Sequence, residues 1–184
     1  MKNSPIRAAS VLLLAFGLAA CGGGGGGGGD STTTTTTTSG GVSGGTLTLS
    51  ATAPAAYTGD IVAASVETKA EAANMAITVP YCTVEFVGAP GPNGKTYNGK
   101  VYFLQGATPT PVNLSIGEEP TYAWGVNDFN VAGVSGVTVD LAGKTISISN
   151  KAMTGTDMNG DPDPAQSAPV NGSIAFPAVA GCGA

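Results

Sequence analysis

Histidine is absent from all 184 residues of this chain. Its absence excludes histidine-based nucleophilic catalysis, zinc-protease motifs and histidine-ligated metal sites. Charge is also scarce: charged residues make up 10% of the chain, with seven basic side chains against twelve acidic ones. Nucleic acids are bound through basic patches, so we expect no nucleic-acid partner for this acidic chain.

Good helix formers are nearly missing as well. Gly, Ala, Ser, Thr and Val dominate, a composition that makes poor helices but acceptable strands and turns. After residue 20, the best helix composition is Thr68–Ala76, where we expect a short helix or an irregular connection because two turns are marginal alone. The composition as a whole predicts an exported all-β protein.

The first 20 residues, which precede Cys21, read as a removable export signal. Lys2 and Arg7 form a positive segment, Val11–Phe16 an apolar one, and Leu18-Ala19-Ala20-Cys21 ends the signal with small residues. The apolar stretch is too short for a membrane-spanning helix. The ending resembles the lipobox of bacterial lipoproteins. The resemblance implies cleavage before Cys21, a diacylglyceryl group on its sulfur and a further acyl chain such as palmitate on its amino group, which together give stable anchoring.

A lipoprotein of this kind has the lipid bilayer as a partner, through acylated Cys21. Sorting rules known for some lipoproteins imply transfer to the outer membrane, because Gly22 rather than Asp follows the cysteine; they leave the leaflet open. Residues 22–45 are almost only Gly, Thr and Ser, which predicts a disordered tether. We therefore divide the chain into a signal peptide (1–20), a lipidated cysteine with tether (21–45) and a single β domain (46–184).

Two cysteines remain besides the one in the lipobox. Outside the inner membrane Cys82 and Cys182 are expected to form a structural disulfide. A reactive thiol pair is the alternative, but the spacing is far from Cys-x-x-Cys and no basic residue lies nearby in sequence.

Short alternating segments follow the tether. Val137–Leu141 and Thr145–Ser149 read as a β-hairpin whose apolar residues share one face. We expect about seven to nine such strands in an antiparallel β-sandwich, with a small β-barrel as the alternative. The opening, Thr46–Ser50, a Gly-Asp turn and Ile61–Val66, resembles that of bacterial immunoglobulin-like domains, although the Cys–Trp–Cys spacing of antibody domains is missing.

One run of oxygen side chains resembles the start of a calcium loop. It comprises Asp157, Asn159, Asp161 and Asp163. Calcium prefers such ligands, but Pro162 and Ala168 stand where an EF-hand has glycine and a bidentate glutamate, and the same residues are common in solvated turns. We expect no cofactor, with calcium as the alternative.

Aromatic residues offer a second candidate site. Trp124 and Tyr122 could form a platform on which sugar rings stack, although a single tryptophan in a small β domain is commonly a core residue. Exposure of Trp124 would distinguish the two interpretations.

The acidic residues leave a hydrolase as a further alternative. Such an enzyme would need a cleft that joins Glu85, Glu118 or Glu119 to Asp128 or Asp140, with raised pKa values. Because histidine-based catalytic motifs are missing, and adjacent glutamates before Pro120 are common in solvated turns, we expect no enzymatic activity. The expected function is a non-catalytic binding or structural module on the envelope or cell surface, with a carbohydrate-binding or calcium-assisted adhesion module as the alternative and an envelope protein or a glycan as possible partner.

Overall fold

The structure is a computed structural model, and it describes residues 44–156 and 161–182. The predicted signal peptide, Cys21 and most of the predicted tether lie outside these residues. The described part contains ten strands and two short 3-10 turns: β1 Gly45–Leu49, η1 Ala55–Tyr57, β2 Gly59–Ala63, β3 Val66–Glu71, β4 Tyr81–Pro90, η2 Pro92–Gly94, β5 Thr96–Leu104, β6 Thr110–Glu119, β7 Gly125–Phe129, β8 Val137–Asp140, β9 Thr145–Thr156 and β10 Pro162–Ala175. None of the described helices is long and apolar enough to cross a membrane.

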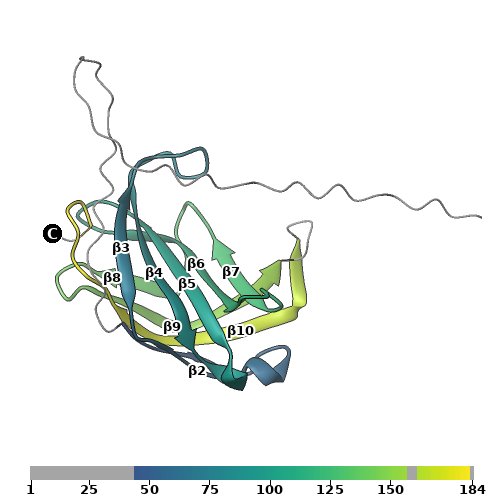
Figure 1. The fold of residues 1–184 in the computed structure, drawn as a ribbon. Coiled ribbons are helices and arrows are strands. Elements are labelled where there is room, and N and C mark those ends of the chain that lie inside the picture. Colours follow the sequence, from purple (N-terminus) through teal and green to yellow (C-terminus); the bar gives the residue numbers. More distant parts are fainter. Residues whose placement is uncertain (1–43, 157–160, 183–184) are drawn as a thin grey trace, which may run out of the picture. The chain divides into compact units, whose positions relative to one another are not determined.

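The strands form one antiparallel sheet (Figure 1) in the order β2-β1-β10-β9-β7-β6-β5-β4-β3, with β8 paired to β9 beside this path. The predicted all-β antiparallel class is confirmed. β2 and β3 are the two edges of the path, yet only Ala64 and Ser65 connect them. A connection of two residues spans at most about 11 Å between flanking Cα atoms, so the sheet curls until its edges are neighbours.

Long, bent strands join the two halves of the curled sheet. β9 pairs with β8 along its first residues and with β7 at Thr154, and β10 follows β9 along most of its length. One half therefore contains β8, the start of β9, the end of β10, β1 and β2, and the other contains β3 to β7. Alternating apolar residues from both halves fill the space between them, including Leu47, Ile61, Val101 and Ile174, each at most 1% exposed.

The predicted hairpin is present as β8 and β9. Val137 pairs with Ile148, and Val139 with Ile146, so the apolar residues share the inner face as expected. β9 continues to Thr156, beyond the predicted end, because it also pairs with the first part of β10.

Of the two alternatives expected for Thr68–Ala76, the short helix is wrong, and an irregular connection is present only after Glu71. Val66–Glu71 forms edge strand β3, followed by irregular backbone. Val66 and Thr68 are fully buried, while the ammonium of Lys69 lies 3.9 Å from Glu85 on β4. Burial of alternate side chains and pairing with β4 outweigh the local helix preference of this segment.

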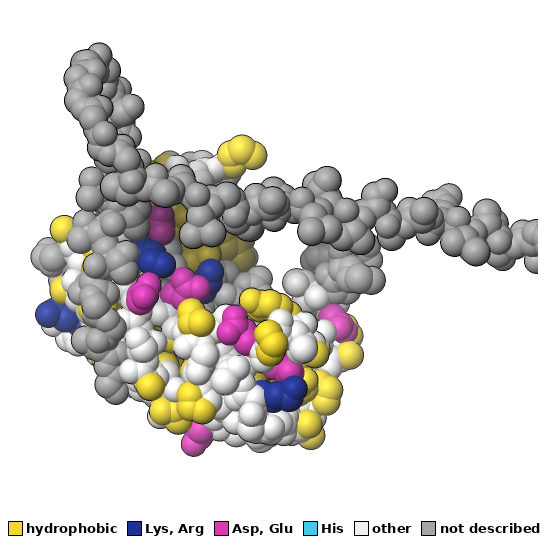
Figure 2. Space-filling view, in the orientation of Figure 1, with side chains coloured by type: hydrophobic (Ala, Val, Ile, Leu, Met, Phe, Trp, Pro, Cys, Tyr) yellow, Lys and Arg dark blue, Asp and Glu magenta, His cyan; other side chains and the backbone are white. Residues whose placement is uncertain are grey.

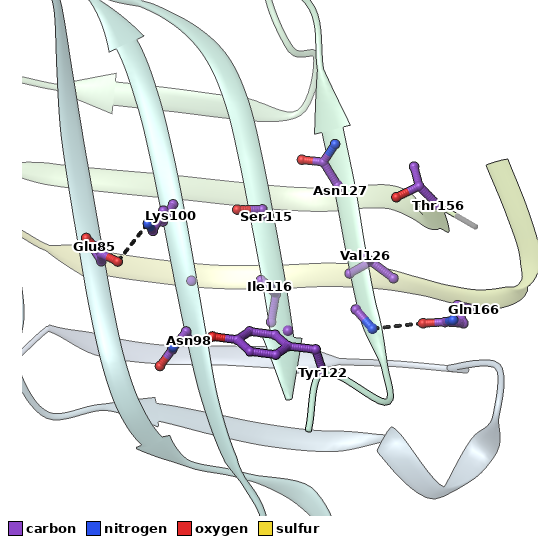
Figure 3. A pocket seen from close by; sticks show the side chains of 13 residues that line it. Glu85, Asn98, Lys100, Ser115, Ile116, Tyr122, Val126, Asn127, Thr156 and Gln166 are labelled. Carbon is purple, nitrogen blue, oxygen red and sulfur yellow. Dashed lines mark hydrogen bonds and ion pairs between the residues drawn. The ribbon is translucent and has the colours of Figure 1, made fainter. Parts of the chain in front are cut away.

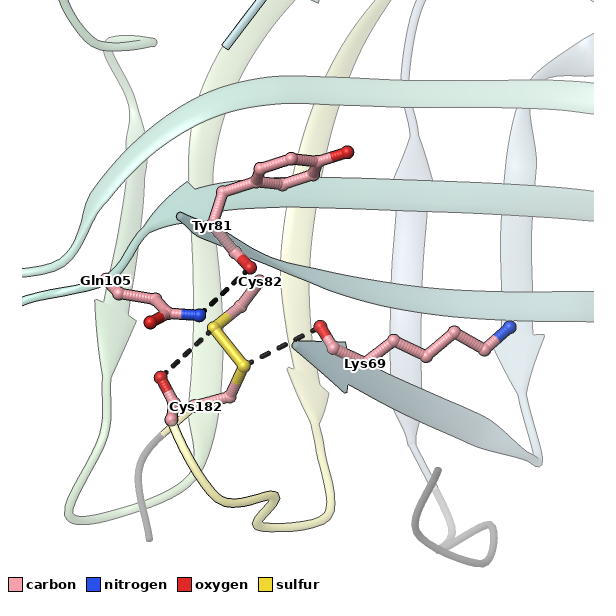
Figure 4. The surroundings of a disulfide bond; sticks show 6 residues. Lys69, Tyr81, Cys82, Gln105 and Cys182 are labelled. Carbon is pink, nitrogen blue, oxygen red and sulfur yellow. Dashed lines mark hydrogen bonds between the residues drawn. A yellow bond between two sulfur atoms is a disulfide. The ribbon is translucent and has the colours of Figure 1, made fainter. Parts of the chain in front are cut away.

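Cys82 and Cys182 form the predicted disulfide, which closes a separation of 100 residues (Figure 4). It ties the segment after β10 to the start of β4, where the side-chain amide of Gln105 donates to the carbonyl of Tyr81. Phe176 packs against Phe103 with ring centroids 6.0 Å apart. The C-terminal segment is thus held by a covalent bond and by core packing.

Candidate functional site

A polar groove of about 430 Å³ crosses the outer face of β4 to β7 (Figure 3). It ends against Thr156 at the end of β9 and Gln166 in the first part of β10. The walls and floor come from thirteen residues in six strands and the β6–β7 turn, and the side chains that matter most are Glu85, Asn98, Lys100, Ser115, Tyr122, Asn127, Thr156 and Gln166. Its volume falls within the range of about 300–1,000 Å³ common for small-molecule sites.

Strand register explains why one wall of the groove is polar. Glu85 of β4, Lys100 of β5, Ser115 of β6 and Asn127 of β7 are successive cross-strand partners, so they form one row on the outer face. The ammonium of Lys100 lies 3.0 Å from the carboxylate of Glu85. The hydrogen bond to Glu85 is the main reason why the pKa of Lys100 is raised. The row therefore offers one neutralised ion pair followed by uncharged polar groups.

The neighbouring row is nearly empty of side chains. Asn98 pairs with Gly117, and Gly117 pairs with Gly125, so the two glycines lie side by side on the floor. A Cβ on Gly117 would meet its nearest atom at 3.7 Å, and one on Gly125 at 3.4 Å, both ordinary contacts. Neither glycine has a positive φ. A Cβ therefore fits at both positions, and the backbone conformation requires glycine at neither.

The other glycines of the described residues differ in this respect. Nine have φ between +20° and +160°, where side chains are strained. The remaining five, Gly44, Gly91, Gly99, Gly143 and Gly155, would each bring a Cβ within 3.0 Å of another atom. Only the pair on the groove floor is free of both constraints among residues 44–156 and 161–182. The missing side chains of Gly117 and Gly125 therefore give the groove its depth at this point.

Tyr122 forms a wall above this floor. Its side chain is 69% exposed, and Figure 3 shows the ring extending across β6 toward Asn98. The Tyr122 hydroxyl donates to Glu119 at 3.2 Å, and Asn98 donates to the same carboxylate. The backbone of Tyr122 has φ 51°, a left-handed conformation that costs a non-glycine residue on the order of 1–2 kcal/mol. Strain of this kind clusters at functional sites.

Trp124, the other half of the predicted aromatic platform, points into the core. It is 1% exposed, its ring stacks on Tyr57 with centroids 4.9 Å apart, and its Nε1 donates to the carbonyl of Ala53 at 3.0 Å. The indole is therefore a core residue and offers no face to a ligand. Of the two predicted platform residues, the structure brings only Tyr122 to the groove.

Glu118 supports the β6–β7 turn from inside. Its carboxylate, 1% exposed, accepts hydrogen bonds from Tyr57 at 2.8 Å, Lys95 at 3.0 Å and Thr121 at 3.0 Å. The bond from Tyr57, followed by that from Lys95, lowers the pKa of Glu118, and the same bond raises the pKa of Tyr57. Because Thr121 directly precedes Tyr122, the buried carboxylate helps to fix the turn that presents the ring.

The acidic residues considered for hydrolysis lie in separate places. Glu85 is in the groove, and Glu118 faces the core on the opposite side of the sheet. Asp128 forms an ion pair with the nearly buried Lys151, and Asp140 accepts from the backbone of Gly143 at 2.9 Å. Within the described part of the chain, the structure brings no two of these carboxylates together in the groove.

The predicted calcium residues are only partly described. Asp157 and Asn159 lie outside the described residues, whereas Asp161 and Asp163 precede or enter β10. Asp163 accepts from the backbone of Ala165 at 2.9 Å and from Gln166 at 3.3 Å. No group of three or more acidic or cysteine side chains that could hold a metal ion occurs among the residues that the structure describes.

No protein-family model, curated protein or solved structure matches this chain. We therefore interpret the groove from the residues that line it. Sequence reasoning missed Gly117 and Gly125 because their meaning depends on register: eight residues apart in the chain, they become neighbours only when β6 pairs with β7.

Proposed function

We propose that this chain is a lipid-anchored protein of the bacterial outer membrane, and that its β domain is a non-catalytic binding module that holds a ligand in the groove across β4 to β7. The groove with its glycine floor is the observation that carries the proposal. The anchor follows from the resemblance of Leu18–Cys21 to a lipobox, and the Gly, Thr and Ser tether gives the domain reach above the membrane.

Three features of the groove favour binding over a purely structural role. Its floor lacks side chains at two positions where a Cβ would make only ordinary contacts, its wall holds an exposed ring on a strained backbone, and most of its other side chains are polar. A strand face with no binding role gains stability from β-branched residues rather than glycine. Glycine at 117 and 125 gives up that stability and leaves space for a ligand.

The acidic residues support a non-catalytic module. Glu85, the acidic residue lining the groove, is neutralised by Lys100 at 3.0 Å and approached by Lys69 at 3.9 Å. Each oxygen of this carboxylate therefore faces an ammonium group. Hydrolysis by paired carboxylates needs a second carboxylate in the same cleft, and the residues that line the groove include no other.

The anchor is tested by intact-protein mass spectrometry of the membrane-extracted protein. We expect a mass that lacks residues 1–20 and carries acyl groups on Cys21. An unacylated mass with the signal retained, or cleaved elsewhere, would contradict the anchor without affecting the groove.

The groove is tested by chemical-shift mapping with a library of small polar fragments. The sample is the chain from residue 21 with Cys21→Ser, which keeps every core residue of the described fold. We expect shifts to concentrate at Asn98, Ser115, Gly117 and Asn127, and to vanish in Gly117→Val.

A matched control carries the same valine elsewhere. Ser147→Val lies on the exposed face of β9 in the other half of the sheet, so it should leave fragment binding unchanged. Fragment shifts spread evenly over the surface, or unaltered by Gly117→Val, would refute the groove as a binding site.

A further inference from the structure

We infer that the ligand of this groove is an uncharged glycan, one of whose sugar rings lies against Tyr122 above Gly117 and Gly125. This inference rests on the proposed function and names the class of ligand. It draws on the exposed ring, the flat floor, the hydroxyl and amide lining, and the absence of net charge in the groove.

The aromatic wall fits the apolar face of a sugar ring. A pyranose presents C–H groups on one face, and aromatic rings bury such surfaces while their polar ends remain hydrogen-bonded. The ring of Tyr122 is exposed, and its hydroxyl is held by Glu119 at 3.2 Å, which limits rotation of the ring away from the groove. A rigid aromatic surface binds at low entropic cost because few side-chain rotations remain to be lost.

The floor sets the depth at which the ring can lie. Gly117 and Gly125 are register partners, so the backbone of two adjacent strands is open to a flat ligand at this point. The nearest neighbour of a Cβ on Gly117, apart from the carbonyl of Trp124, is the Tyr122 ring at 3.9 Å. A side chain at Gly117 would therefore occupy the space directly beside the aromatic wall.

The polar lining fits hydroxyl groups. Ser115 and Thr156 line the groove, and their hydroxyls have no partner among the described residues. The side-chain oxygen of Asn127 already accepts from Asn113 at 2.9 Å, which leaves the amide of Asn127 to donate. Sugar hydroxyls donate and accept, and can therefore pair with all three groups.

Charge argues against an acidic or a basic ligand. Glu85 and Lys100 neutralise each other in the groove, and Glu119 at its rim accepts from Asn98 and Tyr122. Removal of residues 1–20 would leave five basic and twelve acidic side chains, so anionic glycans would be repelled over longer range. Figure 2 shows acidic and basic side chains interspersed on the face that holds β3, β4 and β5, with no surface of a single sign.

The test is a glycan microarray that carries neutral and acidic oligosaccharides, followed by calorimetric titration of the strongest neutral binder. The chain from residue 21 with Cys21→Ser is compared with two variants of Tyr122. Tyr122→Phe keeps the ring, whereas Tyr122→Asn removes it and tolerates the left-handed backbone, so both variants should fold. We expect neutral glycans to bind the parent, Tyr122→Phe to keep the affinity within about threefold, and Tyr122→Asn to lose at least about tenfold, consistent with loss of an aromatic contact.

Each other outcome overturns the inference. Binding confined to acidic glycans would refute the charge argument, and equal binding by Tyr122→Asn would refute the stacking argument. Absence of glycan binding, together with fragment shifts in the groove that Gly117→Val removes, would refute the glycan and leave the binding site standing. Absence of both would refute the proposed function itself.

Discussion

The hydroxyl of Tyr57 donates a hydrogen bond of 2.8 Å to the carboxylate of Glu118, which lies 61 residues later in the chain. Lys95 and Thr121 donate to the other oxygen of this carboxylate, each at 3.0 Å. The turn that carries Tyr122 is therefore joined to η1 and to the residue after η2 through one buried charge. Loss of that charge should affect both stability and the presentation of Tyr122.

Glu118→Gln should lower the free energy of unfolding most strongly at neutral pH. The pKa of Glu118 is lowered in the folded chain from its ordinary value of 4.5, so the carboxylate contributes stability that is complete above about pH 5.5. That contribution is lost as the pH falls through the lowered pKa. Urea denaturation at pH 7 and pH 3 should thus show a difference between parent and variant that shrinks at the lower pH.

Glu67→Gln is the matched control, because the Glu67 side chain is 51% exposed and paired with a surface lysine. Exposed ion pairs contribute at most about 1 kcal/mol, so this variant should differ little from the parent at either pH. A Glu118→Gln variant whose deficit is the same at pH 3 as at pH 7 would contradict the assigned cause.

Tyr97→Phe should change how the free energy of unfolding depends on pH above about pH 10. Burial raises the pKa of Tyr97 from 10.0 to about 12, so the folded chain keeps a proton that the unfolded chain releases between these values. Stability should fall as the pH rises from 10 toward 12, by at most about 3 kcal/mol from this group. Guanidinium denaturation of Tyr97→Phe at pH 9 and 11 should show a smaller fall than the parent, whereas Tyr102→Phe, on the outer face of the same strand, serves as control.

Removal of the disulfide should destabilise the domain strongly. In the chain-entropy model, a closed loop of 100 residues stabilises a fold by about 4–5 kcal/mol. We expect a loss of this order in the double variant Cys82→Ala and Cys182→Ala, measured by urea denaturation against the oxidised parent. A loss below about 1 kcal/mol would show that core contacts such as those of Phe176 hold the C-terminal segment without the covalent bond.

Much of the fold was predictable because its strands alternate. Val137–Asp140 and Thr145–Ser149 place apolar residues at every second position, and a turn between them leaves one pairing that buries all of these. The disulfide was predictable from the cysteine count together with the predicted export signal. The first part of β10 was not, since Pro162–Pro169 is polar and rich in proline and alternates little.

The candidate site was harder to predict, because it depends on pairs that are distant in sequence. Tyr122 and Trp124 both lie in the β6–β7 turn, but the ring of Tyr122 is exposed whereas the ring of Trp124 packs against Tyr57 in the core. The glycine floor needs the register of β6 on β7. The amino-acid sequence alone indicates neither the orientations of these two rings nor the pairing of Gly117 with Gly125.

We predict that Gly117 serves ligand binding and that the fold does not require it. Gly117→Val places a β-branched residue at a strand position where a Cβ makes only ordinary contacts, the nearest at 3.7 Å. Substitutions that leave the native backbone unstrained reduce the freedom of the unfolded chain, and β-branched residues suit strands. The free energy of unfolding should thus stay within about 1 kcal/mol of the parent or rise.

The role of Gly117 in binding is measured by the affinity of Gly117→Val for the strongest neutral oligosaccharide, taken with the free energy of unfolding of the same sample. We expect an affinity at least about tenfold lower with stability retained, because the valine fills the groove beside Tyr122. An unchanged affinity at retained stability would show that the groove does not hold the ligand, and a loss of several kcal/mol of stability would show that the fold itself requires this glycine.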